Sequence, residues 1–454
     1  MSRVRKAIAF FLLAALLMPG NETLFGMARR PAEPEDFPKP IEGWHYTIED
    51  CYRLALRKME TVGMREEDIQ FAVAQYFKAT SEALGDIDFN MIHFSQDAPK
   101  PGTQAGSDSG GSLAGTFAAR NRRERNFTVS QPLFQGFKSW GAILGAGSYK
   151  KQKTEDKIRL EQVLFLEVAS AFYWVLKQRE EVKINEGVIE LFQKRITELS
   201  EREKVGRSRQ SEVVFAEASQ KTIEADLAES KGRLASSRYL LEFLTGILID
   251  PDYLTDDDDV KNDTRALEDY LAAAKTRPDV LASESAVKTA FQGIVVAQSG
   301  LWPSLTWDYT QYERREGFQS GFDWDSTFTA DVPLFRGGET VGKIKEAWSI
   351  WKKSKLEYSF AKRQAELQIK QSYADWQASA EQYRALEEAV LAAEENYWLQ
   401  EQDYARSLVS NLDALQALEA LHNNRRAANL AHYAMKENYR RLQIAAGEIP
   451  GELP

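Results

Sequence analysis

The chain has 454 residues, and its 58 Lys and Arg residues against 68 Asp and Glu residues give a formal net charge of −10 at pH 7. This acidic balance makes the chain a poor candidate for sequence-independent nucleic-acid binding, which needs a positive surface, so no nucleic-acid partner is expected. The single cysteine, Cys51, excludes a disulfide framework and a multi-thiolate metal site, and four histidines leave little material for metal or acid–base chemistry.

The first 28 residues have the pattern of an export signal peptide. Basic residues precede an apolar run from Ala7 to Met18, which is too short to span a bilayer. Candidate cleavage points follow Gly20 and Ala28, and a short membrane anchor is the alternative interpretation. Residues 29–46 form a proline-rich lead-in. A membrane helix needs about 18 consecutive apolar residues, and no later run approaches that length, which excludes a multi-helix inner-membrane transporter. We therefore expect the mature chain to act outside the cytoplasm.

The chain contains an internal duplication. The segment Pro132–Gly136 (PLFQG) recurs as Pro333–Gly337 (PLFRG), a shift of 201 residues that we call the first shift. A second shift, longer by 17 residues, relates Leu84–Ile87 to Trp302–Leu305. The difference between the two shifts fits an insertion in the Gly/Ser-rich stretch 99–115, which has the composition of a loop.

The duplication predicts the domain organisation. A first repeat is expected over 47–246 and a second over 278–447, with an acidic connector over 247–277 and a tail over 448–454. The run Asp256–Asp259 in the connector lacks the glycine and the spaced ligands of a calcium loop, so no metal ion is expected there.

Each repeat is expected to contain a pair of long helices. No proline interrupts Lys138–Lys204, where helix-forming residues dominate. Apolar residues fall seven positions apart along this segment and along its counterpart in the second repeat, which implies a left-handed coiled-coil seam. These positions are Val168, Val175, Val182, Ile189 and Ile196, and then Ile369, Trp376, Tyr383, Val390, Tyr397 and Tyr404. A plain water-soluble coiled coil would explain the helices but not the strands.

Each repeat is also expected to contain a β-hairpin, over 87–133 and over 304–335. Apolar and polar residues alternate with period two in four segments, as in residues 305–309 (LTWDY). The alternation fits a half-buried sheet in water and also a transmembrane β-barrel strand with lipid on one side. Trp302, Trp307 and Trp324 near the strand ends would suit an aromatic girdle.

The number of strands has a consequence for assembly. The smallest membrane barrels have about eight strands, and open sheet edges are not tolerated in lipid. If these four strands enter a membrane, several chains must therefore share one barrel.

The duplicated helix–hairpin–helix unit, with PLF-x-G after the second strand of each hairpin, resembles the TolC-type outer-membrane efflux protein family from about Thr47 to Gly447. The segments Arg277–Val280 and Tyr404–Asp413 support the resemblance. It implies a homotrimer with a twelve-strand barrel and a long periplasmic helical barrel, in contact with outer-membrane lipid, a periplasmic adaptor and an inner-membrane pump. The chain departs from the family where Met59–Met64 replaces an Asn-Pro in the first helix and where Gly85 replaces a proline before the first strand.

The resemblance also implies a gate at the turns between the long helices. Asp413 takes the position of a ring carboxylate, the second acidic position is Gln416, and Glu212 with Tyr404 resembles a hydrogen-bonded latch. Val409 occupies the position of the arginine in the family's latch, so Arg207 or Arg209 would have to take over the contact of that arginine. The tips expected to dock the adaptor are Val205, Gly206, Arg207 and Ser208, and then Ser407, Leu408, Val409 and Ser410. For each of these, an ordinary solvated residue at a helix turn is the alternative.

The sequence contains no recognisable reaction centre. There is no G-x-S-x-G, P-loop or paired-histidine motif, so neither an enzymatic activity nor a cofactor is expected. His422 and His432 are expected to be plain surface residues. A basic group before the second strand could face lipopolysaccharide phosphates or form a solvated loop end; its members are Arg120, Arg122, Arg123 and Arg125.

These observations predict a mainly α fold with a small β part. The expected function is a passive, trimeric exit duct of a tripartite efflux or type I secretion system, in the outer membrane of a Gram-negative bacterium with a large periplasmic portion. The alternative is a soluble periplasmic coiled-coil scaffold or adaptor-like interaction protein.

Overall fold

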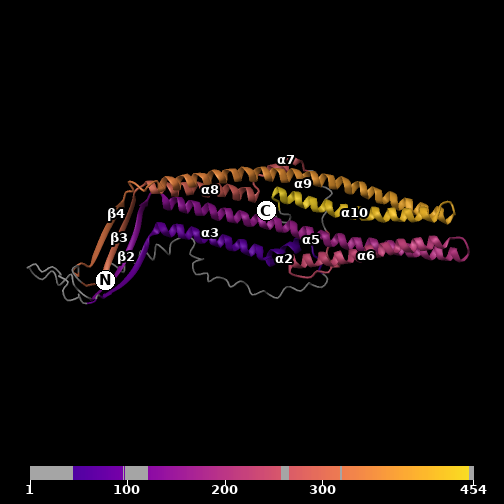
Figure 1. Ribbon diagram of the computed structural model, residues 1–454, viewed down its shortest axis with the longest axis horizontal. Helices are drawn as coiled ribbons and strands as arrows, with labels where there is room; N and C mark the ends of the chain where they lie inside the picture. The colour runs from indigo at the N-terminus through magenta and orange to yellow at the C-terminus, as the bar shows by residue number, and fades with distance from the viewer. Residues whose placement is uncertain (1–43, 96, 98–120, 257–264, 317–319, 449–454) are drawn as a thin grey trace, which may run out of the picture.

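The computed structural model describes residues 44–95, 97, 121–256, 265–316 and 320–448, and these form an elongated array of long helices that ends in a small sheet (Figure 1). The predicted mainly α fold with a small β part is confirmed. Several sequence-based predictions lie outside the described residues: the signal peptide, nearly all of the lead-in, the Gly/Ser-rich stretch 99–115, Arg120, residues 257–259 of the acidic run and nearly all of the tail.

The two repeats have matching helices. In the first repeat, α2 (Ile48–Lys58) and α3 (Glu60–Leu84) precede the hairpin, and α5 (Lys138–Lys204) and α6 (Gln210–Thr245) follow it. The second repeat has α7 (Leu267–Ala273), α8 (Pro278–Gln298), α9 (Glu339–Ala405) and α10 (Asn411–Ala446), with short 3₁₀ turns η1 (Pro251–Tyr253) and η3 (Ser299–Leu301). The first shift relates both ends of α5 to those of α9 and both ends of α6 to those of α10, so the long helices of the two repeats have equal lengths and equivalent bounds.

Both departures from the family pattern have a local structural reason. Met59 lies between α2 and α3 and has an extended backbone, with φ −70° and ψ 116°. It therefore interrupts the first helix without a proline. Gly85 has φ +79°, and a Cβ there would lie 2.2 Å from the carbonyl oxygen of Ser130. The ring of proline confines its φ to negative values, so only glycine fits at the start of the first strand.

The four strands form one antiparallel sheet in the order β1-β2-β3-β4. They are β1 (Asp86–Ser95), β2 (Asn121–Gln135), β3 (Ser304–Arg315) and β4 (Trp324–Asp331). In the register, Ile87 lies opposite Val129, Val129 opposite Tyr309, and Trp307 opposite Phe328. The outer edges of β1 and β4 pair with no other strand among the described residues.

The helices next to the sheet lie side by side in the same order as the strands to which they connect. α3 packs on α5, α5 on α8 and α8 on α9, while α6 packs on α5, and α10 packs on both α9 and α5. Figure 1 shows α3 and α9 on opposite sides of this layer. Three apolar clusters fill it: one around Phe165 under α2, one around Phe192 near the helical turns, and one around Ile369 under α7. In the described part of the chain, no helix has an apolar stretch long enough to cross a bilayer.

The turns between the long helices use the same backbone conformation in both repeats. Gly206 has φ +73°, and Ser407, its equivalent by the first shift, has φ +64°. A left-handed conformation costs a residue with a Cβ about 1–2 kcal/mol. We expect Ser407→Gly to raise the free energy of unfolding by about 1 kcal/mol, measured by thermal unfolding followed by circular dichroism. An unchanged or lowered midpoint would contradict this account of the turn.

Candidate functional site

The sheet has one apolar and one polar face. Because residues on a strand alternate between faces, the register brings the apolar side chains of all four strands together. This apolar face consists of Ile87, Phe89, Met91, Phe127, Val129, Leu305, Trp307, Tyr309, Trp324, Phe328 and Ala330. The opposite face holds a hydrogen-bonded ladder, in which Ser130 donates to Asp308 at 2.6 Å and Asn90 to Asn126 at 3.2 Å.

The described part of the chain leaves the apolar face largely uncovered. Met91 is 69% exposed and Phe328 is 67% exposed. A contiguous apolar patch with an open strand edge on each side marks a surface that contacts a membrane or another protein chain.

The three tryptophans lie at different levels of the sheet. Trp302 precedes β3 at the helical end and meets Phe137 edge-on at 6.1 Å between ring centroids. Trp307 donates a hydrogen bond to Ser326, and Trp324, opposite Gln311, stacks on Tyr309. The aromatic girdle stays a prediction.

The opposite end of the molecule is formed by the two helical turns. Arg207 N–H donates to the carbonyl of Arg202 at 2.8 Å, and Leu408 N–H donates to that of Asp403 at 2.9 Å, so the turns have equivalent backbone hydrogen bonds. Val205 and Leu408 are 68% and 69% exposed. Val409 is partly buried against the apolar cluster around Phe192. Docking of an adaptor on these turns stays a prediction for Val205, Gly206, Arg207 and Ser208, and for Ser407, Leu408, Val409 and Ser410.

Asp413 caps the first turn of α10. Its carboxylate accepts hydrogen bonds from the Ser410 hydroxyl at 2.6 Å and the Ser410 N–H at 2.9 Å, and Gln416 is exposed one turn further on. The hydrogen bonds from Ser410 lower the pKa of Asp413, which favours the carboxylate. The spacing S-x-x-D is the sequence signature of such a capping box, so this role could have been predicted.

The predicted latch between Glu212 and Tyr404 does not form within the described chain. The Glu212 carboxylate instead accepts a hydrogen bond from the Ser208 hydroxyl at 2.7 Å. The ring of Tyr404 is 7% exposed, because it packs in the apolar cluster around Phe192. A local donor thus satisfies Glu212, and packing against α5 holds Tyr404.

Two arginines of α5 hold the ring of Tyr404. The guanidinium carbons of Arg195 and Arg202 lie 4.1 Å and 4.5 Å from its centroid. Both arginines pair with Glu198, at 2.9 Å and 2.8 Å. This group, which we call the tyrosine clamp, joins the end of α9 to α5 through cation–π contacts.

The prediction that His422 is a surface residue is wrong. Its side chain is 3% exposed, and Nε2 lies 2.8 Å from Oδ1 of Asn185 in α5. Asn185 donates in turn to Ser230 of α6 at 3.0 Å. Burial, together with the charge of Arg426, lowers the pKa of His422 and keeps it neutral at pH 7. His432 is half-buried and packs between Tyr383 and Tyr433.

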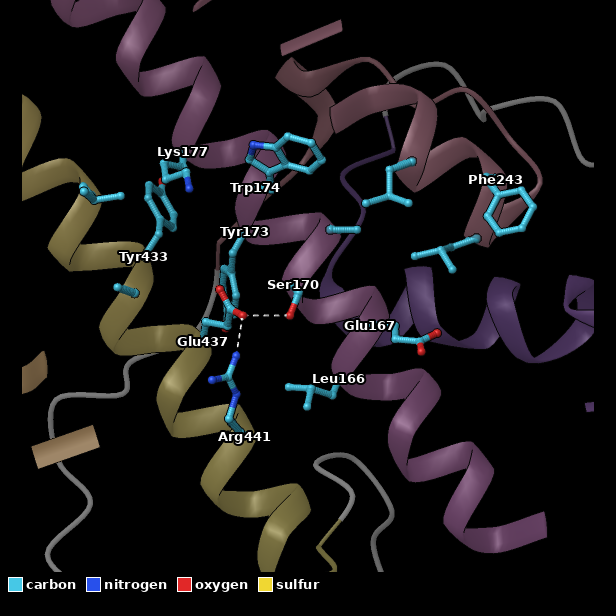
Figure 2. A pocket seen from close by; sticks show the side chains of 15 residues that line it. Leu166, Glu167, Ser170, Tyr173, Trp174, Lys177, Phe243, Tyr433, Glu437 and Arg441 are labelled. Carbon is cyan, nitrogen blue, oxygen red and sulfur yellow. Dashed lines mark hydrogen bonds and ion pairs between the residues drawn. The ribbon is translucent and has the colours of Figure 1, made fainter. Parts of the chain in front are cut away.

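A cavity of about 780 Å³ opens where α5, α6 and α10 meet (Figure 2). Its wall includes Leu166 and Phe243, and Glu437 of α10 accepts hydrogen bonds from Ser170 at 3.1 Å and from Arg441 at 3.0 Å. No group of three or more His, Cys, Asp or Glu within the described ranges is placed to hold a metal ion.

Comparison with known proteins points to one family. Residues 270–448 match the family described as outer membrane efflux protein. The chain is 23% identical to the outer membrane protein TolC of Vibrio cholerae over 341 residues, 70% of this chain and 75% of the relative. A segment of 118 residues, 26% of this chain and 24% of the relative, is 30% identical to the alkaline protease secretion protein AprF of Pseudomonas aeruginosa. The solved structure of CusC, studied for its folding and transmembrane channel formation, has a TM-score of 0.75 at 17% identity and covers 88% of this chain and 92% of CusC. These matches confirm the family resemblance inferred from the sequence.

Proposed function

We propose that this chain, which shares the sequence signature and the fold of the TolC-type outer-membrane efflux proteins, is one subunit of the outer-membrane channel of a tripartite efflux or type I secretion system. Its sheet lies in the outer membrane, and its long helices extend into the periplasm. The channel is a passive exit duct, and an inner-membrane pump supplies the energy.

The observation behind this proposal is the four-stranded sheet with an exposed apolar face and two open edges. Lipid covers the apolar face, and the ladder of Ser130, Asp308 and the neighbouring polar residues faces water inside. Each open edge pairs with the edge of another copy, because lipid does not tolerate unpaired backbone groups. Three copies give twelve strands, enough to close a barrel.

The helical turns form the periplasmic end of the duct. Asp413, Gln416, Glu212 and Tyr404 surround the gate, with Asp413 contributing one carboxylate per chain to a ring, and a periplasmic adaptor docks on the exposed turns. Arg207 and Arg209 are exposed at this end and could take the place of the missing latch arginine at Val409. The tyrosine clamp holds α9 against α5, and we propose that it keeps the gate closed.

The clamp gives a specific prediction for channel opening. Tyr404→Leu removes two cation–π contacts worth about 2 kcal/mol together, which is a ~30-fold change in the equilibrium between closed and open tips. We expect a higher open probability in planar-bilayer recordings of Tyr404→Leu. Tyr404→Phe is the matched control, because it keeps the ring and loses only the hydroxyl; opening by this variant would point to a hydroxyl-mediated latch instead.

Cell fractionation distinguishes the channel from a soluble periplasmic scaffold. The proposal predicts that the protein sediments with the outer membrane and needs detergent for release. Recovery of the protein in the periplasmic fraction without detergent would favour the scaffold and overturn the channel.

A further inference from the structure

The apolar face of the sheet ends in basic residues, at the end of the strands away from the helices (Figure 1). On β2, Phe127 is the last apolar residue of this face, and Arg125 and Arg123 lie beyond it on the same face. On β3, simple alternation would place Glu313 opposite Arg125, but a register shift places Arg314 there instead. The three arginines therefore continue the apolar face.

The arginines next to them in the sequence lie on the polar face. Arg122 lies opposite Phe94, and its guanidinium carbon lies 5.8 Å from the centroid of that ring. Arg315 follows Arg314 and points to the other side of the sheet, where its guanidinium carbon lies 4.0 Å from the ring centroid of Tyr312. The basic group predicted from the sequence is thus divided between the two faces, and an arginine of the second repeat joins one part.

A cavity of about 420 Å³ opens beside the three arginines of the apolar face. The rest of its wall is formed by Met91, Ile92, His93 and Glu124. The carboxylate of Glu124 accepts a hydrogen bond from Asn126 of the polar face at 3.0 Å, so it is turned away from these arginines. Met91 belongs to the apolar face and is 69% exposed. The cavity thus combines guanidinium groups with an exposed apolar side chain.

The guanidinium groups have hydrogen-bonding capacity left for an anion. Arg123 is exposed, and its side chain has no hydrogen bond or ion pair within the part of the chain that the structure describes. Glu313 lies 3.9 Å from Nε of Arg125, which exceeds a hydrogen-bond distance. Glu316 accepts hydrogen bonds from the Arg314 guanidinium and, at 2.8 Å, from the backbone N–H of Arg123. Glu316 therefore fixes two of the arginines beside each other without using all their donors.

The position of these arginines suits the headgroup layer of a membrane. An arginine that faces lipid is costly at the bilayer midplane, and this cost nearly vanishes at the interface. The stacked rings of Tyr309 and Trp324 and the ring of Phe127 lie on the helical side of the arginines. Aromatic rings on a membrane-spanning sheet mark the boundary of the hydrocarbon. The arginines just beyond them would then lie at the level of the lipid phosphates.

We infer that Arg123, Arg125 and Arg314 bind the phosphate group of an outer-leaflet lipid on the outside of the barrel. The planar fork of arginine matches phosphate oxygens through paired hydrogen bonds. A lipid fits better than a free phosphate, because acyl chains attached to the phosphate would lie along Met91 and Phe127. The inference rests on the proposed function, since it requires the apolar face to lie in lipid, and it adds a ligand to the outer surface of the channel.

Native mass spectrometry of the purified protein in detergent tests this site. The probe is phosphatidic acid, whose headgroup is a phosphomonoester, and diacylglycerol is the same lipid without the phosphate. We expect the natural chain to bind phosphatidic acid more tightly than diacylglycerol. Arg123→Gln with Arg314→Gln should weaken the binding of phosphatidic acid by about 25-fold, since each arginine near a membrane surface contributes about fivefold.

The matched control is Arg122→Gln with Arg315→Gln. It removes the same charge at the same level of the sheet, but on the polar face, so it should bind phosphatidic acid as tightly as the natural chain. Equal weakening by both double variants would overturn the site, as would equal binding of the two lipids by the natural chain. Inorganic phosphate in large excess should not displace the lipid; displacement would assign the arginines to a free phosphate and overturn the lipid.

Failure of the site and failure of the channel give different results. A natural chain that sediments with the outer membrane, but binds the two lipids equally, would overturn the site and leave the channel intact. A natural chain recovered from the periplasm without detergent would overturn the channel, and with it the lipid site.

Discussion

Arginine at both Phe89 and Phe328 is expected to abolish insertion of the protein into the outer membrane. Both side chains are exposed on the apolar face, and each lies about midway along the part of its strand that carries that face. An arginine facing lipid at the bilayer midplane costs about 2–4 kcal/mol. In a barrel of three chains, six such arginines would cost about 12–24 kcal/mol. Immunoblots of separated membrane fractions measure the loss.

The control moves each substitution by one residue on the same strand. Asp88→Arg with Thr327→Arg introduces the same number of arginines, but on the polar face, where water solvates them. This variant should insert normally. Normal insertion of both variants would show that lipid does not contact the apolar face.

Asp279→Asn is expected to lower the free energy of unfolding by about 3 kcal/mol, because it removes the counter-charge of a buried arginine. The Arg277 side chain is 1% exposed, and its Nη2 and Nε donate to the two oxygens of Asp279 at 2.6 Å and 2.7 Å. Nη1 donates to the carbonyl of Ala445 at 3.1 Å, which is one of the last carbonyls of α10 and has no partner in its own helix. The pair thus joins the start of the second repeat to its end.

The double variant Arg277→Met with Asp279→Asn is the control. It removes the buried charge together with its partner, so it should recover most of the lost stability. Denaturant unfolding of the detergent-solubilised protein, followed by circular dichroism at 222 nm, measures both variants. A double variant less stable than Asp279→Asn would show that Arg277 stabilises the fold through its hydrogen bond to the Ala445 carbonyl and not through its charge pair with Asp279.

The same pair predicts a pH dependence. Burial by itself would raise the pKa of Asp279, but the hydrogen bonds and charges of Arg277 and Arg159 hold it below its ordinary value. A lowered pKa in the folded state contributes stability above the unfolded pKa, near 3.9. The natural chain should therefore exceed Asp279→Asn in free energy of unfolding by the full amount at pH 7. This difference should shrink as the pH falls below about 4 and vanish below the folded-state pKa of Asp279. A difference that stays constant down to pH 2 would contradict this assignment.

The sequence predicted those features that depend on local periodicity or on the repeat. The first shift and the seven-residue spacing predicted α5 and α9, and period-two alternation predicted the strands and their apolar face. It did not predict that three helices enclose His422, because its partners Asn185 and Ser230 are distant in sequence. The tyrosine clamp was missed for the same reason, since Arg195 and Arg202 look like ordinary solvated helix residues until α9 packs against them.

Single-channel recording of the purified protein in planar bilayers tests the central claim, that several copies of this chain together enclose a water-filled pore. The account predicts stepwise conductance from the oligomer, with longer openings in Tyr404→Leu than in the natural chain. Oligomeric protein that incorporates into the bilayer and conducts in neither form would contradict it.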